Sequence, residues 1–193
     1  QLDKHAHSPL LYHGVMFYID KVQNIDDSMT RYQYFLQCKS DVIEGKLPCT
    51  PKQAVTLAAY SVQAEFGDHD YEQHTPEFFK DYVILPRTMT TDEASLQELT
   101  QEVVTTHHSL QGVAPSVAEL RYLLEARQLD SYGTEFYPTK DDKGRDYLLG
   151  VSYMGISVKD LNGRPSIYFR WSDIANLTQN KRTFGINGMG SNR

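Results

Sequence analysis

The sequence lacks the features that mark membrane-spanning, secreted and disordered chains. No apolar run approaches the about 18 residues that a membrane-spanning helix requires. The first residues, QLDKHAHSP, do not show the basic and then apolar pattern of a signal peptide. Apolar residues make up 40% of the chain and aromatic residues 11%, which is typical of a soluble globular protein. With 193 residues, we expect one or two domains with a buried core.

Cysteine is scarce. The chain contains two cysteines, Cys38 and Cys49. Both lie in or beside predicted helices, where a free cysteine commonly behaves as a small buried apolar residue. We therefore expect reduced thiols rather than a disulfide, which favours a cytoplasmic location.

Positive charge is sparse in the first two thirds of the chain. Residues 1–131 carry 10 Lys and Arg against 19 Asp and Glu, a net charge of −9. Residues 132–193 carry 9 against 6, a net charge of +3, and the chain as a whole has −6. This contrast indicates two modules with different neighbours. The basic module suits anionic lipid or an acidic peptide, and an ordinary solvated surface is equally compatible with +3.

Much of the chain has the apolar period of amphipathic helices. Gly45 ends the first helix, since glycine adopts the left-handed conformation at little steric cost. Thr50 begins the second helix with a capping box, in which proline follows at once and Gln53 stands three residues on. Helices are predicted over residues 29–43, 50–65, 75–82, 92–110 and 115–129.

After Gly133 the period changes from helical to alternating. Asn162-Gly163 is a strong hairpin signal. A further strand is predicted near the beginning of the chain, over residues 10–19, followed by a polar linker over residues 20–28 that supplies a helix N-cap. The later strands are predicted over residues 134–140, 147–153, 156–159, 166–171, 174–178 and 182–186, with the spacing of a small antiparallel sandwich or barrel.

The helical region carries three short motifs. They are Arg31-Tyr32, Leu47-Pro48-Cys49 and Gln63-Ala64-Glu65-Phe66-Gly67-Asp68. Together they resemble the second lobe of FERM domains, a helical lobe that is similar to acyl-CoA-binding proteins. The resemblance implies a lobe that carries no chemistry of its own.

The strand region carries four further motifs. They are Asp130-Ser131-Tyr132-Gly133, Tyr137-Pro138-Thr139-Lys140-Asp141, Asn162-Gly163-Arg164-Pro165 and Phe169-Arg170-Trp171-Ser172-Asp173-Ile174-Ala175-Asn176. These resemble the third FERM lobe, which has a pleckstrin-homology/phosphotyrosine-binding type of fold. Their order and spacing are most similar to the FERM-containing cytosolic protein tyrosine phosphatases of the Pez type. The resemblance covers roughly residues 1–186.

The resemblance implies an α+β fold, in which a helical acyl-CoA-binding-protein-like bundle precedes a partial antiparallel β-sandwich. Residues 1–27 are expected to hold the terminal strand of the ubiquitin-like first lobe, and residues 28–131 the helical second lobe. Residues 132–186 are expected to form part of the third lobe, and residues 187–193 a flexible tail. Because the family's third lobe continues with further strands and a closing helix, we expect an incomplete sandwich.

No residue pattern indicates catalysis, and no catalytic, cofactor-binding or metal-binding residue is predicted. A tyrosine phosphatase needs a His-Cys-x5-Arg loop, which neither cysteine provides, so a phosphatase domain of the parent protein would lie outside this chain. His107-His108 lacks the spacing of a zinc motif, and we interpret it as the solvated end of a helix. Asp68-His69-Asp70 is interpreted as an acidic loop rather than a cation site.

The resemblance implies a non-catalytic adaptor or targeting module at the cell cortex, in junction and growth-control signalling. Its expected partners are cytoplasmic tails of membrane proteins, scaffold proteins or anionic lipid, and no nucleic acid. The candidate contact is an open strand edge that accepts a further strand. It is formed by Lys181, Arg182, Thr183, Phe184 and Ile186. In the alternative interpretation, Lys181-Arg182 is simply a turn.

Two other possibilities remain at this point. The helical lobe could bind acyl-CoA or another small molecule, with Lys39, Lys46 and Lys52 near the phosphates. These lysines stand beside many carboxylates, which argues against such a site. Exposed apolar surface on incomplete lobes would favour a homodimer or strand exchange.

Overall fold

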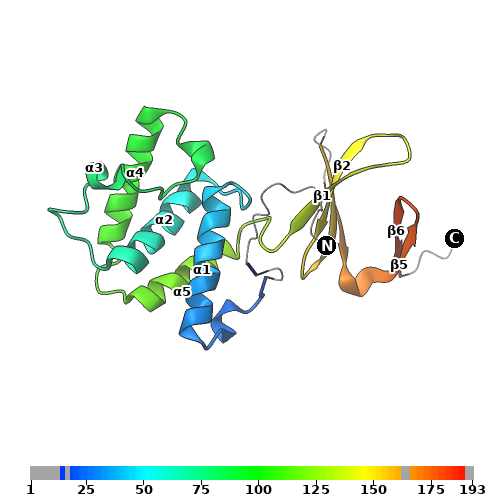
Figure 1. Ribbon diagram of the computed structural model, residues 1–193, viewed down its shortest axis with the longest axis horizontal. Coiled ribbons are helices and arrows are strands. Elements are labelled where there is room, and N and C mark those ends of the chain that lie inside the picture. Colours follow the sequence, from blue (N-terminus) through cyan, green and yellow to red (C-terminus); the bar gives the residue numbers. More distant parts are fainter. Residues whose placement is uncertain (1–13, 16–17, 162–165, 190–193) are drawn as a thin grey trace, which may run out of the picture. The chain divides into compact units, whose positions relative to one another are not determined.

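The computed structural model describes residues 14–15, 18–161 and 166–189, and the chain divides into two compact units. The first unit comprises Gln1–Met16 and Lys21–Asp130, and the second comprises Phe17–Asp20 and Ser131–Arg193. Helices build the first unit and antiparallel strands build the second (Figure 1). The expected α+β fold class is therefore confirmed. Among the described residues, no helix is both long enough and apolar enough to cross a membrane.

The helices of the first unit begin where the sequence places their caps. The side chain of Asp27 accepts a hydrogen bond from the Thr30 N–H, and Asp92 does the same for Ser95. The predicted capping box is present, since the Thr50 hydroxyl accepts from the Gln53 N–H and the Gln53 side chain accepts from the Thr50 N–H. The helices are α1 (Ser28–Ile43), α2 (Pro51–Phe66), α3 (Pro76–Phe79), α4 (Glu93–His108) and α5 (Pro115–Ala126), with 3-10 turns η1 (Val22–Asn24) and η2 (Arg87–Met89).

Helix α2 lies at the centre of the helical unit. It packs against both α4 and α5, and α5 also packs against α1 (Figure 1). Its buried face is rich in small side chains, among them Ala54, Ala58 and Ala59. Between α1 and α5 the rings of Phe35 and Tyr122 meet edge to face, with centroids 5.0 Å apart. The core therefore combines small residues on the central helix with large ones on its neighbours.

A buried glutamine ties the end of α2 to the connection between α4 and α5. The Gln63 side-chain amide donates to Asp68 Oδ1 at 2.8 Å and to the Val113 carbonyl at 2.7 Å. Asp68 Oδ1 also accepts from the Gly112 N–H at 2.8 Å. Gly112 has φ of +82°, a conformation that glycine adopts without strain. These bonds fix the segment after α2 against the rest of the unit.

The second unit contains two antiparallel sheets joined by the 3-10 turn η3 (Trp171–Asp173). In the larger sheet each strand pairs with its neighbour in sequence, which makes it a meander in the order β1-β2-β3-β4. The smaller sheet is the hairpin β5–β6. The strands are β1 (Glu135–Lys140), β2 (Asp146–Val151), β3 (Gly155–Asp160), β4 (Ile167–Arg170), β5 (Ile174–Asn180) and β6 (Thr183–Gly188).

The strand predicted over residues 10–19 is not formed where the structure describes it. Gly14, Val15, Tyr18 and Ile19 have no regular secondary structure, and the rest of that prediction lies outside the described residues. Side chains satisfy the backbone here, because the Gln37 amide donates to the Val15 carbonyl at 2.9 Å. Within the second unit, the Tyr132 hydroxyl donates to the Ile19 carbonyl at 3.0 Å. An isolated strand is not stable without a partner strand, and the backbone of Val15 and Ile19 bonds to side chains instead.

The prediction that a flexible tail begins at residue 187 is also wrong, because Asn187 and Gly188 belong to strand β6. Strand β6 continues through Asn187 and Gly188, which pair with Asn176 and Ile174. A register shift between Ile174 and Asn176 allows pairing to extend beyond Ile186. The predicted Asn162-Gly163 turn lies outside the described residues.

Gly155 provides a test of the meander. A Cβ at this position would lie 2.1 Å from the Phe169 carbonyl oxygen and 2.9 Å from the Arg170 Cα, both on the backbone of β4. Because backbone cannot move aside cheaply, Gly155→Ala is expected to lower the free energy of unfolding by about 2 kcal/mol. Thermal denaturation measures the effect, with Gly144→Asn as the control, since Gly144 has φ of +78° and open space around it. Equal melting temperatures for Gly155→Ala and wild type would contradict the β3–β4 pairing.

Asp141 provides a test by pH. Its carboxylate accepts from the Lys143 and Arg145 N–H groups, both at 2.9 Å, and from Arg145 Nε at 2.7 Å. The backbone N–H of Arg145 contributes most to lowering the pKa of Asp141 below its ordinary value. A lowered pKa stabilises the fold above about pH 4 and loses that effect as the pH falls through the folded-state value.

Asp141→Asn should therefore lower the melting temperature at pH 7 and converge on wild type below the folded-state pKa of Asp141. Melting curves recorded at intervals of about one pH unit between pH 7 and pH 2 resolve the convergence. Asp142→Asn, which changes the neighbouring exposed carboxylate, is the control. A difference that does not depend on pH would exclude the carboxylate as its cause.

Candidate functional site

The five residues predicted to bind a partner lie together on one hairpin. Lys181 and Arg182 form the turn between β5 and β6, and Thr183, Phe184 and Ile186 follow along β6. Lys181 has φ of +53°, and the Thr183 hydroxyl closes the turn by donating to the Asn180 carbonyl at 2.7 Å. The turn interpretation is thus correct for Lys181 and Arg182, and it places both charges at the tip of a strand pair. Partner binding by these residues stays a prediction.

One face of the hairpin is apolar. Ile186 pairs with Leu177 and Phe184 pairs with Gln179, and residues opposite one another in an antiparallel pair share a face. Phe184 is 50% exposed and Leu177 is 40% exposed, whereas Ile186 is partly covered. We call Leu177, Phe184 and Ile186 the hairpin face.

The outer edge of β6 is open within the described part of the chain. There, β5 and β6 pair only with each other. Alternate residues of an antiparallel edge strand direct their backbone N–H and C=O groups away from the partner strand. Such an edge is a template for a further strand.

The charge of the hairpin is uniformly positive. Residues 174–189 contain two basic residues, Lys181 and Arg182, and no acidic residue. Both side chains are exposed. An acidic group near the turn would therefore meet no competing carboxylate within the hairpin.

The lysines of the alternative acyl-CoA site are largely engaged. Lys39 forms an ion pair with Glu65, and Lys46 lies 2.9 Å from Glu44 and 3.3 Å from Asp41. The hydrogen bond that Lys46 donates to Glu44 is the largest cause that raises the pKa of Lys46. Paired lysines are poorly suited to bind phosphate, so the structure offers this alternative no support.

One of the two helix-end histidines was interpreted wrongly from sequence. His108 is exposed and forms a hydrogen bond with the Tyr71 hydroxyl, but His107 is fully buried. His107 continues the inward-facing series of Thr100 and Val103 along α4, a spacing of three and four residues that the sequence does contain. Burial is the main cause that lowers the pKa of His107.

The fold, a helical lobe followed by antiparallel strands of PH-like type, is that of the second and third lobes of a FERM domain. The chain matches the FERM central domain over residues 20–137 and the FERM C-terminal PH-like domain over residues 141–192. It belongs to the FERM family, as the sequence motifs indicate. The matched region is a non-catalytic module.

Among its relatives, the chain is similar to two tyrosine phosphatases. Over 186 residues it is 45% identical to tyrosine-protein phosphatase non-receptor type 21 of Rattus norvegicus. The aligned region covers 96% of this chain and 16% of that protein. It is 44% identical over 182 residues to the human type 14 enzyme, covering 94% of this chain and 15% of that protein. The chain thus spans about a sixth of the length of these curated relatives.

A solved structure has the same fold. The FERM and C-terminal domain complex of Drosophila Merlin superposes with a TM-score of 0.80 at 23% identity, covering 91% of this chain and 59% of that chain. At this identity the likeness shows the fold alone.

Phe184 tests whether the hairpin face is accessible in solution. Because its side chain is half exposed, Phe184→Ala should change the free energy of unfolding by no more than about 0.5 kcal/mol. Ile156→Ala is the comparison, since Ile156 is 1% exposed in β3 and should cost about 3 kcal/mol. Chemical denaturation of both variants makes the measurement. A loss for Phe184→Ala as large as that for Ile156→Ala would mean that the hairpin face is covered.

Proposed function

We propose that this chain is an adaptor module that recruits its parent protein to cytoplasmic tails of membrane proteins or to scaffold proteins by adding a peptide strand to β6. The main observation in support is that three features occur together on the β5–β6 hairpin. These are the open edge of β6, the apolar hairpin face and the cationic turn at Lys181 and Arg182.

Each feature has a separate part in binding. The edge supplies main-chain hydrogen bonds, which give affinity without regard to sequence. The hairpin face takes every second side chain of the added strand, which selects for apolar residues there. Lys181 and Arg182 select for an acidic residue near the turn. The expected ligand is therefore an extended segment of alternating apolar residues with an acidic end.

Relatives of this fold support a binding role. The Merlin FERM structure contains a second segment, its own C-terminal domain. A FERM-containing part of human myosin 7b was solved with a PDZ domain of harmonin. By similarity to the two phosphatases, we infer that the parent is a non-receptor tyrosine phosphatase with its catalytic domain outside this chain. The proposed adaptor role would place it at the cell cortex and its junctions.

Anionic lipid is a weaker candidate for the same turn. A basic residue near an anionic membrane contributes about 1 kcal/mol, so Lys181 and Arg182 together would supply only about 2 kcal/mol. The edge of β6 has no role in such binding. A peptide uses all three features, and we therefore favour the peptide.

Charge reversal tests the proposal. Fluorescence anisotropy with a panel of labelled tail peptides of alternating apolar residues and an acidic end measures affinity. The double variant Lys181→Glu, Arg182→Glu should weaken binding about tenfold or more, and the loss should shrink at high salt. The matched control is Lys52→Glu with Arg121→Glu, which makes the same charge change at exposed positions of α2 and α5.

Three outcomes would contradict the proposal. Equal losses in the hairpin variant and the control would assign the effect to net charge. Binding to phosphatidylserine vesicles without any peptide binding would assign the hairpin to lipid. A concentration-dependent dimer that Phe184→Ala dissolves, seen by light scattering, would assign the edge to a second copy of this chain.

A further inference from the structure

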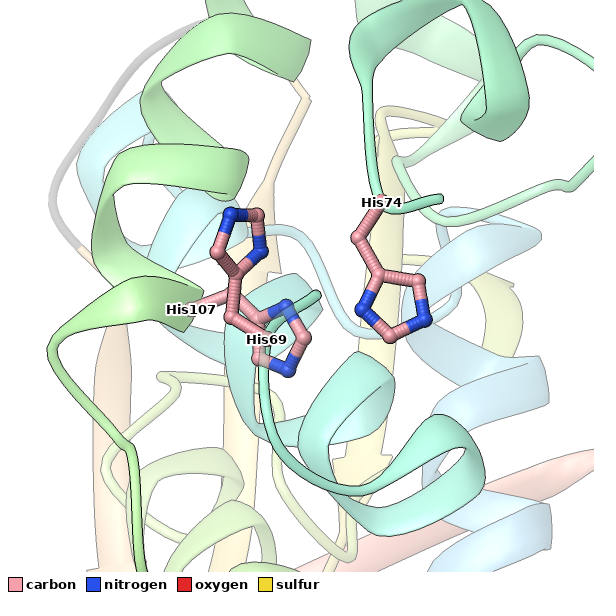
Figure 2. Close-up of side chains that lie close together, drawn as sticks. All are labelled: His69, His74 and His107. Carbon is pink, nitrogen blue, oxygen red and sulfur yellow. The ribbon is translucent and has the colours of Figure 1, made fainter. Parts of the chain in front are cut away.

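Three histidines from separate segments meet in the helical unit. His69 follows α2, His74 precedes α3, and His107 lies in the last turn of α4 (Figure 2). One ring nitrogen of each lies within 4.8 Å of the other two. The ring centroids are 5.3 Å apart for His69 and His107, and 5.4 Å apart for His74 and His107. His74 was not noticed in the sequence, because nothing in its spacing links it to α4.

The hydrogen bonds of the cluster leave ring nitrogens directed inward. His107 Nε2 lies 2.8 Å from the Gly67 carbonyl, so this nitrogen carries the proton and Nδ1 keeps its lone pair. In the described part of the chain, His107 Nδ1 is buried without a hydrogen-bond partner, and so is His69 Nδ1. Native proteins rarely leave buried polar atoms unsatisfied, and a bound ion is one established reason for such atoms.

The hydrogen bond from His107 to the Gly67 carbonyl is of the kind that orients a metal-binding histidine. A histidine that binds a metal through one nitrogen usually donates its other N–H to a carbonyl or carboxylate, which fixes the ring orientation. His74 differs, since its Nδ1 accepts from the Asp70 N–H at 3.0 Å. Coordination through this nitrogen would exchange that bond for one to the metal.

The surroundings of the cluster are aromatic, and burial disfavours the charged form of His69 and His107. His74 stacks near Phe66, Phe78 and Phe79, with centroid distances of 5.6–5.9 Å. Burial is the largest cause that lowers the pKa of both His69 and His107. Neutral imidazole is the form that binds metal.

We propose that His69, His74 and His107 bind a zinc ion that ties the α2–α3 connection to the end of α4. Three imidazoles suit zinc among the common cellular metals, and three protein ligands leave a fourth position for water. Tetrahedral zinc at 2.0–2.1 Å needs nitrogens about 3.3 Å apart, so small side-chain rotations close the site from its present spacing. The ion satisfies both unpaired Nδ1 atoms at once.

Because the chain is a non-catalytic FERM module, we assign the ion a stabilising role, although three protein ligands leave its fourth position to water. The segment between α2 and α3 is also attached by Asp68 to Gly112 and Gln63. Gly67 and Tyr71 attach it to the end of α4 through His107 and His108. An ion shared by this segment and α4 stabilises the folded unit by mass action, because the unfolded chain holds no preformed site. The competing account is a metal-free cluster of packed aromatic and histidine rings.

Zinc titration of the full chain separates the two accounts. The background carries His5→Ala, His7→Ala and His13→Ala, which removes the other histidines that could bind zinc on their own. Isothermal titration calorimetry should give one site, weakened about tenfold or more in each of His69→Gln, His74→Gln and His107→Gln. His108→Gln, next to His107 and exposed, is the control and should remain within about twofold of the background.

A measurement without substitutions in the histidine cluster protects the test from folding defects. Long-range ¹H–¹⁵N spectra of the background chain should show large zinc-dependent shifts at one ring nitrogen of each of His69, His74 and His107. Shifts at His108 should be much smaller, although its ring centroid lies 5.6 Å from that of His69. Cobalt(II) should give the visible bands of a tetrahedral site. Unshifted ring nitrogens, a dissociation constant weaker than about 1 mM, or equal affinity in His69→Gln and His108→Gln would each overturn the proposal.

Discussion

The packing of α2 against α4 and α5 is the constraint on which the helical unit depends. Ala54, Ala58 and Ala59 are buried on α2, and their short side chains let neighbouring helices approach closely. Because α2 is held on two sides, its last turn is fixed, and buried Gln63 can fasten the next segment to Val113 and Asp68. The histidine cluster depends on this order, since Gly67 orients His107 and the same segment carries His69.

The two units differ in what they offer a partner. In the helical unit, side chains cap the N-termini of α1, α2, α3 and α4, and two of the candidate phosphate-binding lysines are paired with carboxylates. The hairpin β5–β6 offers exposed Phe184 and Leu177, an edge with which no described strand pairs, and a cationic turn with no acidic residue in the hairpin. In the proposed function, recognition at the hairpin leaves the helical unit to act as a scaffold. This division agrees with the acidic charge of residues 1–131 and the basic charge of residues 132–193.

Local chemistry made much of the fold predictable. Thr50 and Gln53 predict a helix start from four residues, and the alternation of apolar and polar residues after Gly133 predicts strands. Both signals act over short distances in the sequence. The hairpin residues could be placed on one strand for the same reason. The fate of residues 10–19 could not, because a strand exists only if another strand is beside it. The histidine cluster depends on three segments meeting in space, although the inward spacing of Thr100, Val103 and His107 was readable in the sequence.

The central claim is that this FERM module recognises partners through the hairpin while the helices hold their structure. Residue-resolved amide hydrogen exchange, recorded with and without the tightest-binding tail peptide, tests it most directly. The account predicts slower exchange over Thr183–Gly188 on binding, with unchanged rates in α1, α2, α4 and α5. Protection that appears in the helices and leaves β6 unchanged would contradict it.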